Sequence, residues 1–98
     1  MGIREEISEQ YDGILFADGL DRACIGVARR YTGDVACYDV DMCIEVFMED
    51  GMTYEDAREY FEYNVIGAFM GEFTPVFVER FGNGYLNLLG DKENAEDN

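Results

Sequence analysis

Carboxylates are the side chains of this chain that offer the most chemistry. Asp39, Asp41 and Glu45 lie close together at the expected start of a helix, and carboxylate oxygens of this kind bind Mg²⁺ or Ca²⁺. An Asp-x-Asp pair before a helix is more often an N-cap, whose oxygens accept hydrogen bonds from the amides of the first helical turn. We therefore expect no metal ion and no other cofactor at these residues.

Other catalytic side chains are scarce. The chain has no histidine, which removes the usual general base and most zinc chemistry. Its one serine, Ser8, lacks the sequence context of a nucleophile elbow. Cys24, Cys37 and Cys43 form no close CxxC pair and have no visible activating partner. The glycines are scattered and make no phosphate-binding loop. We expect a protein that is not an enzyme.

Two rows of carboxylates recur with helical spacing. Side chains three or four residues apart share one helical face, and four residues rise about 6 Å along the axis, so such a row can imitate neighbouring phosphates of a nucleic-acid strand. The solvent-facing side of any acidic protein gives a similar pattern, but residues 34–62 contain ten acids and a single basic residue, Arg58. The rows are Asp41, Glu45 and Glu49, followed by Glu55, Glu59 and Glu62.

Tyrosines are interleaved with these acids. Tyr38, Tyr54, Tyr60 and Tyr63 fall in or beside the same stretch, and we expect that not all of them point inward. An exposed tyrosine beside carboxylates offers a large contact area at low entropic cost, as in protein interfaces. Tyr54 and Tyr63 are therefore added to the six acids as predicted partner-binding residues.

Apolar residues recur on the helical faces opposite the two rows of acids, which predicts a helical hairpin within residues 39–70. Asp50-Gly51-Met52 joins its two helices. Thr53 is the expected N-cap of its second helix. We expect Phe47, Phe61 and Val65 to be buried. The apolar positions are Val40, Cys43, Ile44 and Phe47 in the first helix and Ala57, Phe61, Val65 and Ala68 in the second.

The rest of the chain supplies the elements on which this hairpin packs. A short N-terminal helix is expected at residues 3–11, and strands at residues 14–17, 23–31, 35–38 and 76–78. The predicted fold class is α+β: a small, mainly antiparallel sheet of three to four strands with the hairpin on one face. We expect one domain over residues 1–89 and a disordered acidic tail at 90–98.

The charge of the chain restricts its partners. There are 22 acidic and 7 basic residues, giving a net charge of −15. This balance argues against direct binding to nucleic acid or to an anionic membrane and favours a cationic partner, although acidity also serves solubility alone. The charged first ten residues do not read as a signal peptide, and no apolar run approaches the roughly 20 residues of a membrane span. Together with an odd number of cysteines, this predicts a reducing cytoplasm.

Three motifs carry a resemblance to known proteins: Asp39-x-Asp-x-Cys-Ile-Glu, Asp50-Gly-Met-Thr-Tyr-Glu-Asp-Ala and Phe61-Glu-Tyr-Asn-Val-Ile-Gly-Ala. Over residues 14–77 the chain resembles a group of small uncharacterised proteins of tailed phages and prophages. The resemblance implies an accessory phage protein in the cytoplasm of the host cell, with no established activity. Small acidic phage proteins include inhibitors of host CRISPR and restriction systems, some of which mimic nucleic acid.

These observations lead to one functional prediction and one alternative. We expect a non-enzymatic inhibitor whose acidic face occupies the basic groove of a host nucleic-acid-binding defence protein. The alternative is a structural or regulatory phage protein that self-associates, for example as a homodimer, through its tyrosines and apolar residues. A carboxylate-metal enzyme ranks below both. The predicted partner-binding residues are Asp41, Glu45, Glu49, Glu55, Glu59, Glu62, Tyr54 and Tyr63.

Overall fold

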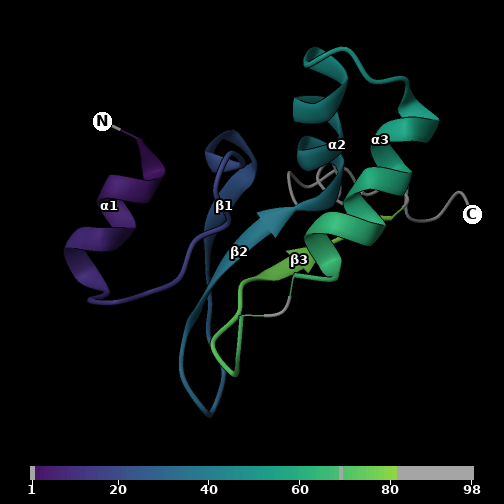
Figure 1. Cartoon of the computed structure of the whole chain (residues 1–98). Helices are drawn as coiled ribbons and strands as arrows, with labels where there is room; N and C mark the ends of the chain where they lie inside the picture. The colour runs from purple at the N-terminus through teal and green to yellow at the C-terminus, as the bar shows by residue number, and fades with distance from the viewer. Residues whose placement is uncertain (1, 69, 82–98) are drawn as a thin grey trace, which may run out of the picture.

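A computed structural model describes residues 2–68 and 70–81 of the chain (Figure 1). Three helices and a three-stranded sheet make an α+β fold, which confirms the predicted fold class. The predicted tail at 90–98 and the last part of the predicted domain lie outside the described residues. The elements are α1 (Ile3–Gln10), a 3-10 turn (Asp21–Ala23), β1 (Cys24–Ala28), β2 (Val35–Asp39), α2 (Val40–Glu49), α3 (Tyr54–Tyr60), a π-helical segment (Phe61–Ile66) and β3 (Val76–Val78).

The sheet has β2 at its centre, in the order β1-β2-β3. β1 and β2 form an antiparallel hairpin, whereas β3 runs parallel to β2 with Cys37 opposite Val76. The parallel pairing follows from the connection, since the helical hairpin carries the chain back to the end at which β2 began. All five residues of β2 are buried, as expected for a strand with neighbours on both edges.

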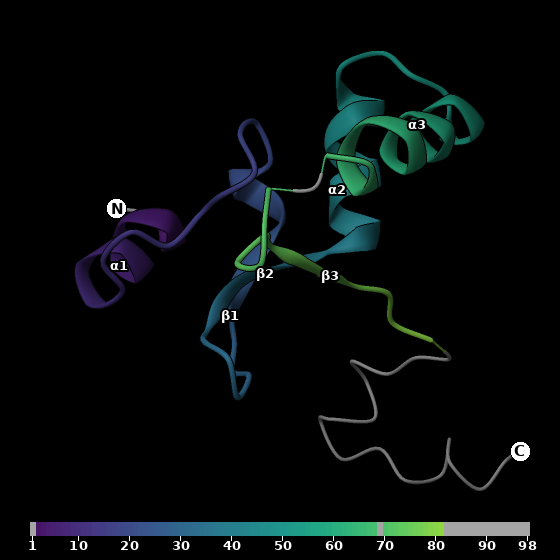
Figure 2. The same cartoon turned by 60° about the horizontal axis from the view of Figure 1, so that its bottom comes forward.

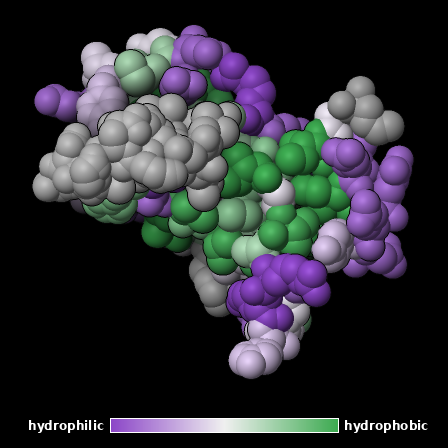
Figure 3. Space-filling model, turned by 180° about the vertical axis from the view of Figure 1, so that it is seen from behind, coloured by the Kyte–Doolittle hydropathy of each residue, from purple (hydrophilic) through white to green (hydrophobic). Residues whose placement is uncertain are grey.

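The helical hairpin covers one face of the sheet, and α1 lies beside β1 (Figures 1 and 2). Phe77 of β3 links the layers, because its ring stacks on Tyr38 and meets the edge of Phe61, both at 5.5 Å between centroids. Hydrophobic side chains also gather on the back of the molecule (Figure 3). Among the described residues, no helix is long and apolar enough to cross a membrane.

The N-cap of the second helix and part of its apolar face agree with the prediction from the sequence. Thr53 accepts a hydrogen bond from the amide of Asp56 at 3.1 Å, which confirms it as the N-cap of α3. Phe61 is buried at 2% exposure. Phe47 and Val65 are only partly buried at the edge of the core, and Ala68 is exposed. The apolar face of the second helix is thus shorter than predicted.

Residues 14–17 do not form the predicted strand. The segment runs as irregular chain, and the backbone N–H of Ala17 donates to the hydroxyl of Tyr38 at 2.8 Å. A side chain from β2 therefore supplies the hydrogen-bond partner that a neighbouring strand would have provided. The apolar side chains of this segment still pack against the core, which explains the apolar run without a sheet.

Candidate functional site

The acids of α2 are exposed, and two of them, Glu45 and Glu49, lie near Arg22 of the 3-10 turn. Arg22 of that turn places Nη2 at 2.6 Å from Oε1 of Glu49. The hydrogen bond and charge of Glu49, with further contributions from Glu45 and Asp50, raise the pKa of Arg22. Asp41, in the first turn of α2, is exposed as well. The row predicted from four-residue spacing is therefore a surface feature of α2.

The predicted acids of the second helix have different neighbours. Arg58 places Nη2 at 3.4 Å from Glu79 and lies over the ring of Tyr54 at 6.0 Å, with Glu62 also close to its charge. Glu59 lines an open depression of the hairpin surface whose lining does not include Glu62. The helix passes into the wider turn of the π-helical segment at Phe61, where the spacing of an α-helix no longer applies.

An open depression lies on the surface of the hairpin. It is lined by residues of α3, of the π-helical segment and of the turn before α3. Two carboxylates and two tyrosines lie there side by side. The lining residues are Met52, Asp56, Glu59, Tyr60, Tyr63 and Asn64. We call this surface the acid–tyrosine depression.

Three of the four interleaved tyrosines are exposed. Tyr54, Tyr60 and Tyr63 show 56%, 41% and 76% of their surface to solvent, whereas Tyr38 is fully buried. The ring of Tyr60 also meets Phe47 of α2 edge-on at 4.9 Å between centroids. Tyr60 therefore combines a structural contact between the two helices with an exposed edge in the depression.

Asp56, Tyr60 and Asn64 belong to this surface although they were not among the predicted residues. The spacing from Asp56 to Tyr60 and Tyr63 indicates that these side chains are neighbours on a helix. Asp56 also lies in the first turn of α3, where an acid is explained by helix initiation alone. Asn64 carries no charge or ring that would mark it in the sequence. Of the eight predicted residues, only Glu59 and Tyr63 lie in the depression within the part of the chain that the structure describes.

The carboxylates that suggested a metal site are placed differently from one another. Asp39 is buried at 1% exposure, and its Oδ1 accepts a hydrogen bond from the amide of Met42 at 3.0 Å. Its Oδ2 faces Nη2 of Arg80 at 2.7 Å. Asp41 and Glu45 point to solvent. Residues 2–68 and 70–81 contain no group of three or more acids or cysteines arranged to hold a metal ion.

Within the described residues, ion pairs engage few of the acids of the hairpin. Its exposed acids are Asp41, Glu45, Glu49, Asp50, Glu55, Asp56, Glu59 and Glu62. Within the described ranges, Glu49 is the one of these eight that forms an ion pair. The hairpin therefore presents an anionic surface with exposed tyrosines.

No protein-family model, curated protein or solved structure matches this chain. The resemblance of its motifs to small phage proteins consequently stays a prediction.

Proposed function

We propose that this protein is a non-enzymatic binding protein whose hairpin occupies a basic, nucleic-acid-binding groove of another protein. The observation that carries the proposal is the set of eight exposed acids on the hairpin at residues 41–62, of which Glu49 alone is ion-paired within the described residues. An arginine-lined groove would supply the missing cations through charge-assisted hydrogen bonds. The phage resemblance makes a host defence protein of the CRISPR or restriction type the partner that we expect.

The spatial distribution of the acids is compatible with mimicry of a nucleic acid. Glu45 and Glu49 lie one helical turn apart, at a rise of about 6 Å. The acids after the turn have different neighbours, because Glu59 of α3 lines the depression and Glu62 of the π-helical segment lies near Arg58. This arrangement suits a groove that wraps around the hairpin, since a flat surface would reach only some of these acids.

A matched pair of variants tests whether charge placement matters. The first variant replaces Glu45, Glu49, Glu55 and Glu59 with glutamine. The control replaces Glu6, Glu9, Asp12 and Glu72, all exposed, with their amides. Each variant changes the net charge from −15 to −11, one unit for each of four substitutions, so general electrostatic attraction is reduced equally. Amides keep the shape of the side chains and create no new repulsion.

Immobilised protein and both variants would be used to capture proteins from a bacterial lysate. The proposal requires a captured protein that itself binds DNA or RNA, that is lost with the hairpin variant, and that is retained by the control. It also requires that a nucleic acid and this protein exclude each other from the captured partner. Equal losses with both variants, or simultaneous binding of nucleic acid, would contradict the proposal.

Self-association is a second candidate function, favoured by the exposed rings of Tyr54 and Tyr60 in α3 and of Tyr63 in the π-helical segment that follows it. Two copies that meet through these rings would have to overcome the repulsion between chains of net charge −15. Dimerisation should therefore strengthen with added salt, whereas binding to a basic groove should weaken. Sedimentation equilibrium at low and high salt distinguishes the two.

A further inference from the structure

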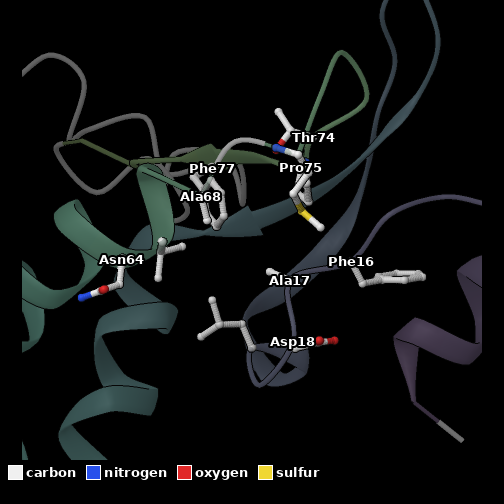
Figure 4. A pocket seen from close by; sticks show the side chains of 11 residues that line it. Phe16, Ala17, Asp18, Asn64, Ala68, Thr74, Pro75 and Phe77 are labelled. Carbon is white, nitrogen blue, oxygen red and sulfur yellow. The ribbon is translucent and has the colours of Figure 1, made fainter.

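An apolar pocket of about 220 Å³ opens beside the hairpin, between the π-helical segment, the loop before the 3-10 turn and the start of β3 (Figure 4). Leu20 and Pro75 are buried residues of its lining, and Val65 and Phe77 are lining residues that are partly buried. The ring of Phe77 points into the pocket, whereas the carboxylate of Asp18 and the amide of Asn64 point away from it (Figure 4). The interior is therefore apolar and its polar groups stand at the rim.

The size of the pocket selects the kind of group that fits. Pockets for cofactors and drug-sized ligands usually measure ~300–1,000 Å³. An apolar cavity of about 150 Å³ is enough to bind benzene. A space of about 220 Å³ thus matches one aromatic ring, which is the kind of side chain that dominates protein interfaces when it enters a pocket.

Asn64 connects this pocket with the acid–tyrosine depression, because it lines both. On the opposite rim, Asp18 already faces Arg4 at 3.7 Å. The uncompensated negative charge beside the pocket is therefore on the Asn64 side, where Asp56 and Glu59 lie within the depression. A basic group next to the inserted ring would meet two carboxylates and the faces of exposed tyrosines.

We propose that the pocket and the acid–tyrosine depression together bind a protein segment in which an aromatic residue neighbours an arginine or lysine. The aromatic ring fills the pocket, and the basic side chain lies over Asp56 and Glu59. Glu59 lines the depression together with Asn64, and Asn64 also lines the pocket, so the two halves of the site are adjacent. An extended segment spans about 7 Å in two residues, and residues two apart point to the same side. The ring and the basic group are thus separated by one residue.

This inference rests on the proposed function, since it names the chemistry of the partner segment that the anionic hairpin binds. The probe is the synthetic peptide acetyl-Gly-Arg-Gly-Phe-Gly-amide, titrated into the full ¹⁵N-labelled protein and followed by NMR. We expect shifts of the amide signals of Leu20, Asn64, Val65 and Ala68. Replacing phenylalanine in the peptide with alanine should weaken binding at least tenfold, and replacing arginine with glutamine should weaken it severalfold.

Protein variants locate the two halves of the site. Ala68→Phe places a ring at the exposed rim of the pocket and should abolish binding of the peptide. Ser8→Phe adds the same ring on the exposed face of α1 and should leave binding unchanged. Asp56→Asn combined with Glu59→Gln should weaken binding severalfold, unlike Glu6→Gln combined with Glu9→Gln, which changes the net charge by the same amount.

The titrations with the parent peptide and its two variants test the inference even if the Ala68→Phe protein does not fold. If the alanine peptide binds as tightly as the parent, or if the shifts fall outside the pocket, or if no peptide binds, the pocket is not a ring site and the inference is overturned. The four glutamine substitutions of the capture experiment change no residue that lines the pocket. Failure of the pocket and failure of the proposed function are therefore seen separately.

Discussion

Arg80 places Nη2 at 2.7 Å from Oδ2 of Asp39 and so connects the chain after β3 to the junction between β2 and α2. Asp39 is 1% exposed, while the side chain of Arg80 is 38% exposed. The same carboxylate caps α2 through its other oxygen. One buried side chain therefore fixes the start of the acidic hairpin and its orientation over the sheet.

Two substitutions at Asp39 should separate these roles. Asn caps helices as well as Asp does, so Asp39→Asn should lose only the ion pair, at a cost of about 1–2 kcal/mol, because Arg80 remains partly hydrated. Asp39→Ala should cost roughly 1 kcal/mol more, the usual value of a lost N-cap. Urea unfolding measures both free energies, and equal losses would show that the cap contributes nothing.

Phe61 should be the most costly truncation in the hairpin. It is 2% exposed and packs edge-on against Phe77, so Phe61→Ala should destabilise the protein by about 3–5 kcal/mol through lost contacts and a cavity. Tyr63→Ala, two residues along, removes a ring that is 76% exposed and should cost less than about 0.5 kcal/mol. Thermal unfolding of the two variants compares them. A large loss for Tyr63→Ala would place that ring in the core.

Local signals in the sequence were sufficient for much of the fold. Thr53 was recognisable as a cap because a hydroxyl before an acidic first turn satisfies helix amides, and Phe61 because it lies on the apolar face. The strand expected at residues 14–17 was wrong, since an apolar run alone does not distinguish a strand from a packed loop. Its actual partner, the hydroxyl of Tyr38, is 21 residues away and has no local signal.

The surface was less predictable than the core. Exposure of Tyr54 and Tyr63 followed from the spacing of acids and apolar residues. The separation of Glu59 from Glu62 did not, because the π-helical segment that begins at Phe61 changes which side chains share a face. The apolar pocket was also hidden, since it is assembled from segments that lie far apart in the sequence, such as those of Leu20, Val65 and Pro75.

Stability should fall steeply at alkaline pH. Burial raises the pKa of Tyr38 to about 12, against the opposing effect of the Ala17 amide, and burial likewise raises the pKa of Cys43 to about 12. The folded state holds these protons more tightly than the unfolded state, whose groups ionise near pH 10 and about 8.5. The stabilisation is therefore complete below these unfolded values and is lost as the pH rises to about 12.

Tyr38→Phe tests the contribution of the buried hydroxyl. Near pH 7 the variant should be less stable by about 1–3 kcal/mol, because the Ala17 amide loses its acceptor. Between pH 10 and 12 its free energy of unfolding should decline less steeply than that of the parent protein. Urea unfolding at several pH values gives both quantities. Parallel pH profiles for the two proteins would show that Tyr38 ionises equally easily in both states.

Salt should distinguish a docked anionic hairpin from an interface that is mainly apolar. Exposed charges are screened over about 8–10 Å at physiological ionic strength, so binding of the basic partner should weaken progressively as salt is raised from 50 to about 500 mM. The glutamine variant at Glu45, Glu49, Glu55 and Glu59 should show a shallower dependence, because fewer charge pairs remain to be screened. The control variant at Glu6, Glu9, Asp12 and Glu72 should keep the steep dependence of the parent, since the docked charges are intact.

Calorimetric titration with the purified partner measures the dissociation constants. A salt dependence that is the same for all three proteins would assign the affinity to the exposed tyrosines and apolar groups instead of the carboxylates.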